Sequence, residues 1–375
     1  MSARTPLLLQ VVSRLTPGRC GVSDQAVLLA GELRRVFGIE TAYLVLNSSE
    51  PSGVLDPVSY CLPAQLLANA LQLTGGRPGA ILVHMSGYGY APDGAPARVA
   101  EALAEVRASG KFDLAAYFHE LYASGMPWRS AFWDARKQQR VMRQVASQCG
   151  LIVTSIGRHV AWLERQARTL ALPPVQWLPV FSAAGEATNR RPVPQRDPAL
   201  VVFGLAGTRR QAYRQLRTRM QMLDALGVEE ILDVGSPCEI PERIGRIAVK
   251  PMGRLATEEL GPLFAQSAFG YVPHPHYCLG KSSIFASYTA QGTIPVTAQP
   301  FTGEFDGLRD GVHLVSSRTA PEVRDSGLDA CSQAAWNWYN AHRLRVHAEL
   351  YARWMGHAAD RADAAGTTEY AGSAG

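Results

Sequence analysis

The sequence has few features that would place it outside the ordinary folded α/β proteins. Charged residues make up 18% of its 375 residues, and this modest share excludes a highly charged disordered chain. No apolar run approaches the roughly 20 residues that a membrane-spanning helix needs. The start of the chain also lacks the charged and apolar regions of a cleaved secretion signal. These absences predict a cytoplasmic protein that does not span a membrane.

Cysteine pairing and clustered charge are missing as well. The sequence has six cysteines, at positions 20, 61, 149, 238, 278 and 331, and no Cys-x-x-Cys pair among them. This spacing indicates neither a zinc site nor a disulfide framework, and no cofactor is expected. The formal charge of +5 is spread along the chain rather than gathered in one segment, which predicts no nucleic acid among its partners.

What the chain does contain is an alternation of short apolar runs with segments of helical periodicity. This pattern is typical of strand-helix units that form a parallel sheet. The expected strands of the first half are 7–12, 40–46, 80–84, 114–118, 151–154 and 175–180, and the expected helices are 23–35, 63–73, 96–107, 130–148 and 158–170. Residues 1–185 are therefore predicted to form one Rossmann-like, doubly wound domain.

A stretch rich in proline and arginine interrupts the alternation, and its three prolines disfavour helix interiors and central strands. We place a linker at 186–198 and a second Rossmann-like domain at 199–332, with strands at 200–203, 230–234, 246–249, 269–272 and 293–297. A long amphipathic C-terminal helix is expected at 333–358. The small and polar residues 359–375 are expected to form a disordered tail.

Ligands of open α/β sheets collect at the carboxyl ends of the strands, so the segments that follow the strands are the candidate sites. After the first strand, glycines that include Gly21 let the backbone approach an anion at a helix start; a turn capped by Ser23 or Asp24 explains them equally well. After the third strand, the hydroxyls of Ser86 and Tyr88 suit a sugar or another polyhydroxylated acceptor, with an ordinary aromatic loop as the alternative.

An imidazole and a carboxylate follow the fourth strand together. His119 could hydrogen-bond a reacting sugar and is the candidate catalytic residue, and Glu120 lies beside it on the acceptor side. A structural histidine is the alternative interpretation.

Two segments of the second domain suit phosphate. Lys281, Ser282 and Ser283 stand at the start of an apolar helix, where a cation, hydroxyls and backbone amides would meet an anion; a capped helix with a solvated lysine is the alternative. Arg209 and Arg210 follow another strand and supply guanidinium groups for bidentate phosphate binding.

Two doubly wound domains, a glycine loop after the first strand, a His-Glu pair after a central strand and a long C-terminal helix resemble the GT-B glycosyltransferases. The second half is similar to the bacterial, retaining "glycosyl transferases group 1" class at 250–255, 258–260, 268–273, 280–282 and 292–296. The resemblance implies GT-B architecture with a C-terminal helix that crosses back to the first domain. It implies a metal-independent hexosyltransferase that moves a sugar from a nucleotide-sugar donor to a saccharide, lipid or small-molecule acceptor with retention.

The resemblance also implies where the donor lies. The diphosphate would bind Arg209, Arg210, Lys281 and amides near Gly21, and His119 would position the donor sugar. The class carries a Glu-x7-Glu pair in the donor half, but here Leu279 and Ser287 occupy its positions. Either Lys281, Ser282 and Ser283 take over those contacts, or the protein is a catalytically silent GT-B binding or scaffold protein.

Two further enzyme classes and one surface bear on the interpretation. A nucleotide-sugar epimerase would use the same fold. A nicotinamide dehydrogenase is disfavoured, since the glycine fingerprint is missing. On the helix expected at 130–148, Arg136, Arg140 and Arg143 share a face with Lys137 nearby, which predicts either weak contact with anionic membranes or a solvated basic face.

Overall fold

The computed structural model describes residues 6–47, 53–123, 130–323 and 327–356. The chain forms two compact units, of which the first comprises Met1–Leu178 and Leu344–Gly375 and the second comprises Pro179–Arg343. The predicted tail at 359–375 lies outside the described residues.

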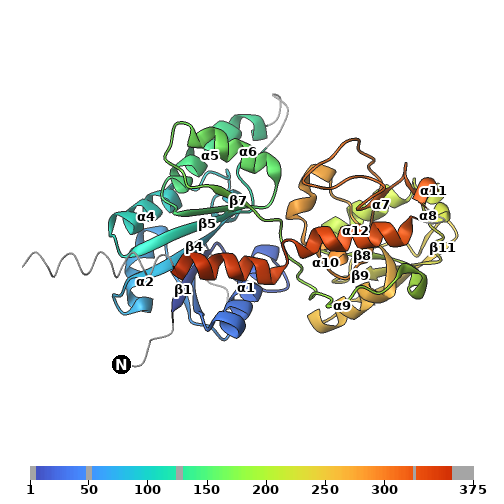
Figure 1. Ribbon diagram of the computed structural model, residues 1–375, viewed down its shortest axis with the longest axis horizontal. Helices are drawn as coiled ribbons and strands as arrows, with labels where there is room; N and C mark the ends of the chain where they lie inside the picture. Colours follow the sequence, from blue (N-terminus) through green and yellow to red (C-terminus); the bar gives the residue numbers. More distant parts are fainter. Residues whose placement is uncertain (1–5, 48–52, 124–129, 324–326, 357–375) are drawn as a thin grey trace, which may run out of the picture. The chain divides into compact units, whose positions relative to one another are not determined.

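The first unit is built on a parallel seven-stranded sheet in its described part, with strand order β3-β2-β1-β4-β5-β6-β7. The strands are β1 (Leu7–Val12), β2 (Glu40–Val45), β3 (Val58–Tyr60), β4 (Gly79–Met85), β5 (Phe112–Phe118), β6 (Leu151–Thr154) and β7 (Val175–Trp177). The strands expected from the apolar runs are confirmed. Only β3, a three-residue strand at one sheet edge, lacks such a run. The central strands β4 and β5 lie side by side in Figure 1.

Helices cover both faces of this sheet. They are α1 (Gly21–Phe37), α2 (Leu66–Thr74), the short α3 (Gly87–Tyr90), α4 (Ala97–Ala108), α5 (Ser130–Ala146) and α6 (Gly157–Ala167), with a 3-10 turn η1 (Pro63–Gln65) before α2. α2, α4 and α5 share one apolar core with alternate strand residues such as Leu9 and Val83. α1 packs on the opposite face, where Ala26 and Ala30 meet Val12 and Tyr43. The polar Gln10 and His84 alternate with the residues of the first core, so they lie on the face that α1 covers.

The second unit repeats the doubly wound plan in the order β10-β11-β9-β8-β12-β13-β14. Its strands are β8 (Asp197–Phe203), β9 (Glu230–Val234), β10 (Arg243–Ile244), β11 (Ile247–Gly253), β12 (Ser267–Tyr271), β13 (Ile294–Thr297) and β14 (Val315–Ser316). In the described part, only the pairing of the edge strand β10 with β11 is antiparallel. The prediction of two Rossmann-like α/β units is confirmed.

The helices of the second unit also cover both faces of its sheet. They are α7 (Ala206–Leu216), α8 (Met220–Ala225), α9 (Thr257–Gln266), α10 (Ser283–Ala290), α11 (Ala320–Val323) and α12 (Leu328–Asn340), with 3-10 turns η2 (Val193–Gln195) and η3 (His276–Lys281). α7, α8 and α11 share one core, and α9 and α10 share the other.

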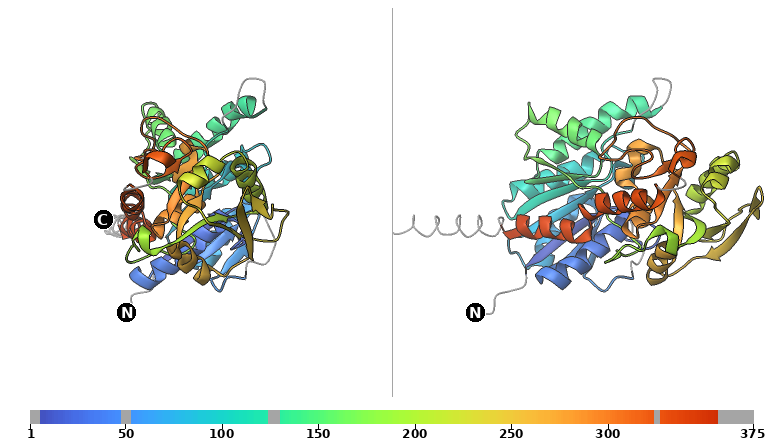
Figure 2. Two further views of the ribbon diagram at one scale, coloured as in Figure 1. Left: turned by 90° about the vertical axis from the view of Figure 1, so that its right-hand side faces the viewer. Right: turned by 45° about the vertical axis from the view of Figure 1, so that its right-hand side comes forward.

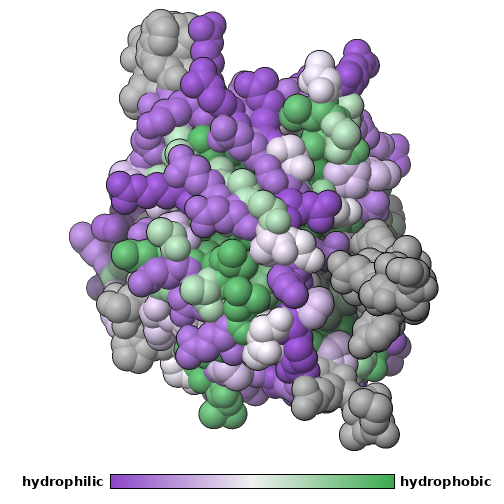
Figure 3. All heavy atoms as spheres, turned by 90° about the vertical axis from the view of Figure 1, so that its left-hand side faces the viewer, coloured by the Kyte–Doolittle hydropathy of each residue, from purple (hydrophilic) through white to green (hydrophobic). Residues whose placement is uncertain are grey.

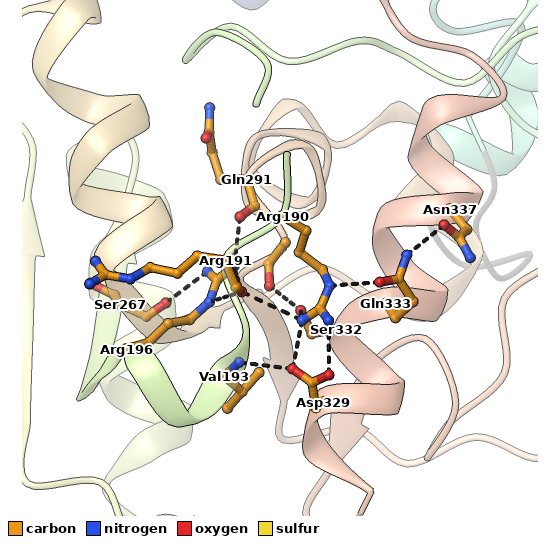
Figure 4. Close-up of polar contacts among 11 residues, drawn as sticks. Arg190, Arg191, Val193, Arg196, Ser267, Gln291, Asp329, Ser332, Gln333 and Asn337 are labelled. Carbon is orange, nitrogen blue, oxygen red and sulfur yellow. Dashed lines mark hydrogen bonds and ion pairs between the residues drawn. The ribbon is translucent and has the colours of Figure 1, made fainter. Parts of the chain in front are cut away.

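The segment rich in proline and arginine packs within the second unit instead of acting as the link between the units. The Arg190 guanidinium makes a two-pronged ion pair with Asp329 of α12, at 2.7 and 2.8 Å. Arg196 is buried and donates to the backbone oxygens of Arg191 and Gln291 (Figure 4). These contacts hold 186–198 against α12 and the sheet, and the chain passes from one unit to the other at Leu178 and Pro179.

The single helix expected at 333–358 is two helices. α12 ends at Asn340, and a second helix covers 344–356 after a break at 341–343. At the break, His342 packs edge-on against Trp338 and Tyr339, and Arg343 pairs with Glu186 at 3.1 Å, which keeps these residues in the second unit. The helix 344–356 belongs to the first unit.

The helix 344–356 covers the same face of the first sheet as α1. Arg345 stacks over the ring of Phe37 at the end of α1, at 4.9 Å from its centroid, and His347 lies beside Tyr117 of β5. Figure 2 shows this red helix alongside the blue elements at the start of the chain. The C-terminal helix therefore crosses back to the first unit, as the fold class predicts.

Candidate functional site

The first unit offers a ligand-binding edge where its chain order reverses. From β1 the chain continues outward to β2 and β3, and it then returns to β4 on the other side of β1. Such a switch point is where open α/β sheets bind ligands. The loops after the two strands are packed closely there, because a Cβ on Gly89 would lie only 2.7 Å from Ser13 Oγ. A side chain at position 89 would therefore displace the Ser13 side chain.

The glycine loop after β1 is shaped by turn chemistry. The Asp24 carboxylate accepts from Gly18 N–H at 2.5 Å, and Ser23 Oγ accepts from Thr16 N–H at 3.1 Å while donating to Arg14 O. Gly21 is the exposed first residue of α1. The Ser23 and Asp24 contacts explain why the loop has this shape. The amides of the first turn of α1 remain groups without a partner within the helix.

The predicted acceptor-side hydroxyls lie in the loop after β4. Ser86 directly precedes α3, and Tyr88 is about half exposed, with 49% of its surface accessible. The Tyr88 hydroxyl accepts from Gln138 Nε2 at 3.1 Å, and the buried Gln138 also donates to Asp93 O. The Tyr88 ring is therefore held in place by α5 while its face stays accessible.

His119 follows β5 and is nearly buried, with 8% of its surface accessible. Its Nε2 lies 3.3 Å from Nδ1 of His84, and Nε2 of His84 lies 2.7 Å from Oε1 of Gln10. The ring of Tyr117 lies 4.5 Å from that of His119. Sequence reasoning named His119 and its neighbour Glu120 but gave no role to Gln10 or His84. Gln10 is a polar residue within the otherwise apolar strand LLLQVV. This interruption was the sequence signal that could have marked Gln10 as part of a buried polar contact.

Burial keeps His84 neutral. Desolvation lowers the pKa of His84 to about 3, against about 6.5 for an exposed histidine. Between these values the unfolded chain binds a proton that the folded chain does not, so stability is full above pH 6.5 and falls as the pH decreases. We expect His84 to cost about 2 kcal/mol of unfolding free energy between pH 7 and pH 5.

Urea unfolding of the wild type and of His84→Leu at the two pH values measures this cost. The variant is expected to lose less stability between pH 7 and pH 5. Equal losses in the two proteins would show that His84 titrates normally in the folded state.

The second unit has its switch point between β8 and β12, from which the chain continues in opposite directions. α7 follows β8, and its Gln211 and Gln215 side-chain amides both donate to Pro273 O in the loop after β12. At Gly204, where φ is 132°, a Cβ would lie 2.9 Å from Ile284. The starts of α7 and α10 are therefore held close to each other at this edge.

The loop after β12 brings a histidine, a lysine and two serines together at the start of α10. Ser282 is the N-cap of α10, since its Oγ accepts from Phe285 N–H at 3.2 Å. His274 Nδ1 lies 2.9 Å from the same Oγ. Desolvation, and then the positive charge of Lys281, lower the pKa of His274. This loop is an electropositive position that disfavours a second cation and favours an anion.

The predicted residues of this loop have different surroundings. The hydroxyl of Ser282 serves the cap and His274, whereas Ser283 and Lys281 are partly exposed. His274 was not predicted as a site residue. Leu279 and Ser287, which occupy the positions of the missing glutamates, are buried, and Ser287 Oγ lies 3.5 Å from Ser182 Oγ.

Arg209 is an internal group of the second unit. Only 1% of its surface is accessible, its guanidinium forms an ion pair with Asp233, and it donates to Ser236 O and to Cys238 Sγ. Tyr213 donates to the other oxygen of Asp233 at 2.8 Å. This geometry argues against the predicted phosphate contact, because the donors of Arg209 point into the protein. The neighbouring Arg210 is exposed.

The basic face of α5 is exposed at Arg136, Arg140 and Arg143, and Lys137 forms an ion pair with Asp93. On the face of the first unit drawn in Figure 3, hydrophobic side chains form groups separated by hydrophilic ones. Among the described residues, no helix is both long and apolar enough to cross a membrane. Histidine, cysteine and carboxylate side chains of the described ranges do not gather in threes where a metal ion could be held. All six cysteines lie in these ranges, and none forms a disulfide.

The chain was compared with protein families, curated proteins and solved structures. No family model matches it, and neither does any curated protein. Solved structures of GT-B glycosyltransferases are similar over nearly their whole length. A trehalose-phosphate synthase (UDP-forming) from Burkholderia vietnamiensis is 13% identical with a TM-score of 0.59, over 96% of this chain and 99% of that one.

Two further structures agree with this similarity. The E. coli structure described as trehalose-6-phosphate bound with UDP-2-fluoro glucose is 10% identical with a TM-score of 0.57, and the match covers 93% of this chain and 98% of that one. An alpha-glucosyltransferase in complex with UDP-glucose and DNA is 13% identical with a TM-score of 0.55, over 90% and 95% of the two chains. At these identities the similarity establishes the fold, which is the GT-B fold that the sequence predicts.

The alpha-glucosyltransferase structures correct one expectation. Several of them contain DNA, so the prediction that excluded nucleic acid from the partners is wrong for this fold. That prediction was based on the absence of a clustered basic segment. Spread charge in the sequence does not exclude a basic surface in the folded protein.

Proposed function

We propose that the protein is a glycosyltransferase that moves a hexose from a nucleotide sugar to a hydroxyl acceptor, with retention and without a metal ion. Support comes from the GT-B fold across both units and from the electropositive loop His274–Ser283 at the switch point of the second sheet. That loop is the observation on which the proposal depends. Because the similar structures contain UDP or UDP-glucose, uridine diphosphate sugars are the first donors to test. Free thiols on buried cysteines support the cytoplasm as the compartment.

On the second unit, we assign the binding of the diphosphate to Lys281 and the start of α10. The bond between the anomeric carbon and the diphosphate oxygen breaks, and negative charge develops on the departing phosphate. A positioned ammonium and helix amides stabilise that charge. The acceptor oxygen forms the new bond on the same face of the sugar, and its proton passes to the departing phosphate oxygen. Ser283 and the exposed Arg210 are further donors that we assign to this side.

On the first unit, we assign to His119, which follows β5, the positioning of a sugar hydroxyl. The accessible Tyr88 ring offers a flat face for a sugar, and Ser86 and Glu120 offer hydrogen bonds in the loops that follow β4 and β5. Gly21 contributes the amides at the start of α1. Acceptors to test include saccharides and DNA that carries a hydroxymethyl base.

A catalytically silent nucleotide-sugar-binding protein is the second candidate. It is favoured by Leu279 and Ser287 at the glutamate positions, since their buried apolar and hydroxyl side chains supply no carboxylate. Product analysis decides between the two, because a silent protein leaves the nucleotide sugar intact with every acceptor. A changed nucleotide sugar in the absence of acceptor would indicate an epimerase.

Proton uptake tests where the diphosphate binds. Desolvation and the charge of Lys281 keep His274 neutral, so an anion that neutralises this charge is expected to raise the pKa of His274 and to cause proton uptake at pH values below the ordinary histidine pKa. Calorimetry of UDP binding in buffers of different ionisation enthalpy measures the uptake. The wild type is expected to take up more protons than His274→Asn, which keeps a side chain that can bond Ser282.

Because protons released or bound by the nucleotide itself are common to both proteins, the difference between them isolates His274. UDP binding with equal uptake in the two proteins would place the diphosphate elsewhere.

A further inference from the structure

A buried hydrogen-bonded chain leads from α1 to His119 across three strands of the first sheet. Its first member is Gln10 of β1, whose side-chain Nε2 donates to Ala26 O at 3.0 Å. An amide nitrogen only donates and an amide oxygen only accepts. The contact with Ala26 therefore fixes the orientation of the Gln10 amide and turns Oε1 toward His84.

The orientation of Gln10 determines the proton positions on both histidines. Oε1 of Gln10 can only accept, so Nε2 of His84, at 2.7 Å, carries a proton. Nδ1 of neutral His84 is then an acceptor, and its neighbour at 3.3 Å, Nε2 of His119, must be the donor. All three side chains are more than nine-tenths buried, so water does not readily compete for these bonds.

We propose that Gln10 and His84 are positioning residues that hold His119 in the tautomer with its proton on Nε2, so that Nδ1 of neutral His119 is a hydrogen-bond acceptor. A group that Nδ1 can receive is a hydroxyl, such as that of a sugar. When His119 takes up a proton, the proton goes to Nδ1, and the bond from Nε2 to His84 is kept. The role in sugar positioning rests on the proposed function, whereas the tautomer does not.

The neutrality of His84 supports this chain independently. Its lowered pKa, caused by burial, means that it does not become doubly protonated at ordinary pH. A doubly protonated His84 would have no acceptor for His119. Hydrogen bonds to a second ring nitrogen are the usual way in which proteins select a histidine tautomer.

Nitrogen-15 NMR of the wild-type protein with labelled histidine tests the tautomer directly. In neutral His119 the Nε2 signal is expected to be of the protonated type and the Nδ1 signal of the unprotonated type. In Gln10→Leu, His84 loses its acceptor, and the ratio of the Nδ1-protonated to the Nε2-protonated form of neutral His119 is expected to rise about fivefold, the factor that one net hydrogen bond contributes. A matched control is Tyr43→Phe, which removes another donor to Ala26 O, at 3.4 Å, and is expected to change nothing.

A wild-type His119 protonated on Nδ1, or equal spectra in the wild type and Gln10→Leu, would overturn the proposal. The wild-type spectrum decides the tautomer even if Gln10→Leu does not fold. Where turnover is measured, kcat/KM is expected to fall in Gln10→Leu by at most about fivefold, the largest loss that a fivefold change in the tautomer ratio can cause, and to stay unchanged in Tyr43→Phe. His119→Asn is expected to retain more activity than His119→Gln, because the asparagine oxygen lies near the place of Nδ1. Absence of turnover with any donor would count against the proposed function, and the nitrogen signals would still decide the tautomer.

Discussion

Arg209→Leu is expected to destabilise the second unit by roughly 3 to 5 kcal/mol, the usual cost of removing one partner of a buried ion pair. The variant leaves the Asp233 carboxylate buried, with the Tyr213 hydroxyl still donating to it. Burial already raises the pKa of Asp233 despite these contacts. Urea unfolding followed by circular dichroism measures the loss.

Arg210→Leu is the matched control, because the next residue is exposed and its loss is expected to change stability by less than about 0.5 kcal/mol. In the double variant Arg209→Leu with Asp233→Leu, much of the lost stability should return, since no uncompensated charge is left. If the Arg209→Leu protein had wild-type stability and bound UDP more weakly, Arg209 would be a donor-phosphate ligand after all.

Lys281→Met is expected to weaken the binding of a nucleoside diphosphate by about 1.5 to 3 kcal/mol, or roughly 10- to 150-fold. Methionine keeps the length of the side chain and removes the charge. The reason for the effect is the position of Lys281 next to Ser282, the N-cap of α10, where its charge adds to burial in lowering the pKa of His274. Titration calorimetry with UDP measures the change in Kd.

Lys250→Met provides the control on the same unit. Lys250 is a lysine of β11 that forms an ion pair with Glu230, and its loss is expected to leave Kd within about twofold, as for other exposed ion pairs. Equal effects of the two variants would show only a loss of general positive charge. The assignment of the diphosphate to Lys281 requires that Lys281→Met bind UDP clearly more weakly than Lys250→Met does.

The sheets could be predicted because their strands are buried on both faces. Runs such as LLLQVV and EILDV are short and apolar and are followed by turn residues, and they became β1 and β9 with their predicted bounds. The edge strands β3, β10 and β14 have only two or three residues. Such strands take their conformation from the neighbouring strand and leave no periodic pattern in the sequence.

The long-range partners of charged side chains could not be predicted. Arg209 looked like a phosphate ligand because it follows a strand and a glycine, but its partner Asp233 lies on the adjacent strand β9. The segment at 186–198 looked like a linker because of its prolines, yet Arg190 binds Asp329, 139 residues away. Pairings of this kind follow from strand order, which a single sequence does not state.

The candidate site was predicted in part for the same reason. Lys281, Ser282 and Ser283 do stand at a helix start, since glycine, serine and an apolar run are local signals. Ser282, however, uses its hydroxyl for the cap and for His274. The chain from Gln10 to His119 joins β1, β4 and β5 and became visible only when these strands were placed side by side.

A thermal-shift panel of nucleoside diphosphates, with wild type and Lys281→Met side by side, tests the central claim most directly. Selective binding to the folded state raises the unfolding temperature, and the rise grows with the logarithm of the ligand concentration once this exceeds Kd. We predict that at least one nucleoside diphosphate, with UDP first, raises the unfolding temperature of the wild type and raises that of Lys281→Met much less. A wild-type protein that no member of the panel stabilises, or a variant stabilised as strongly as the wild type, would contradict the account.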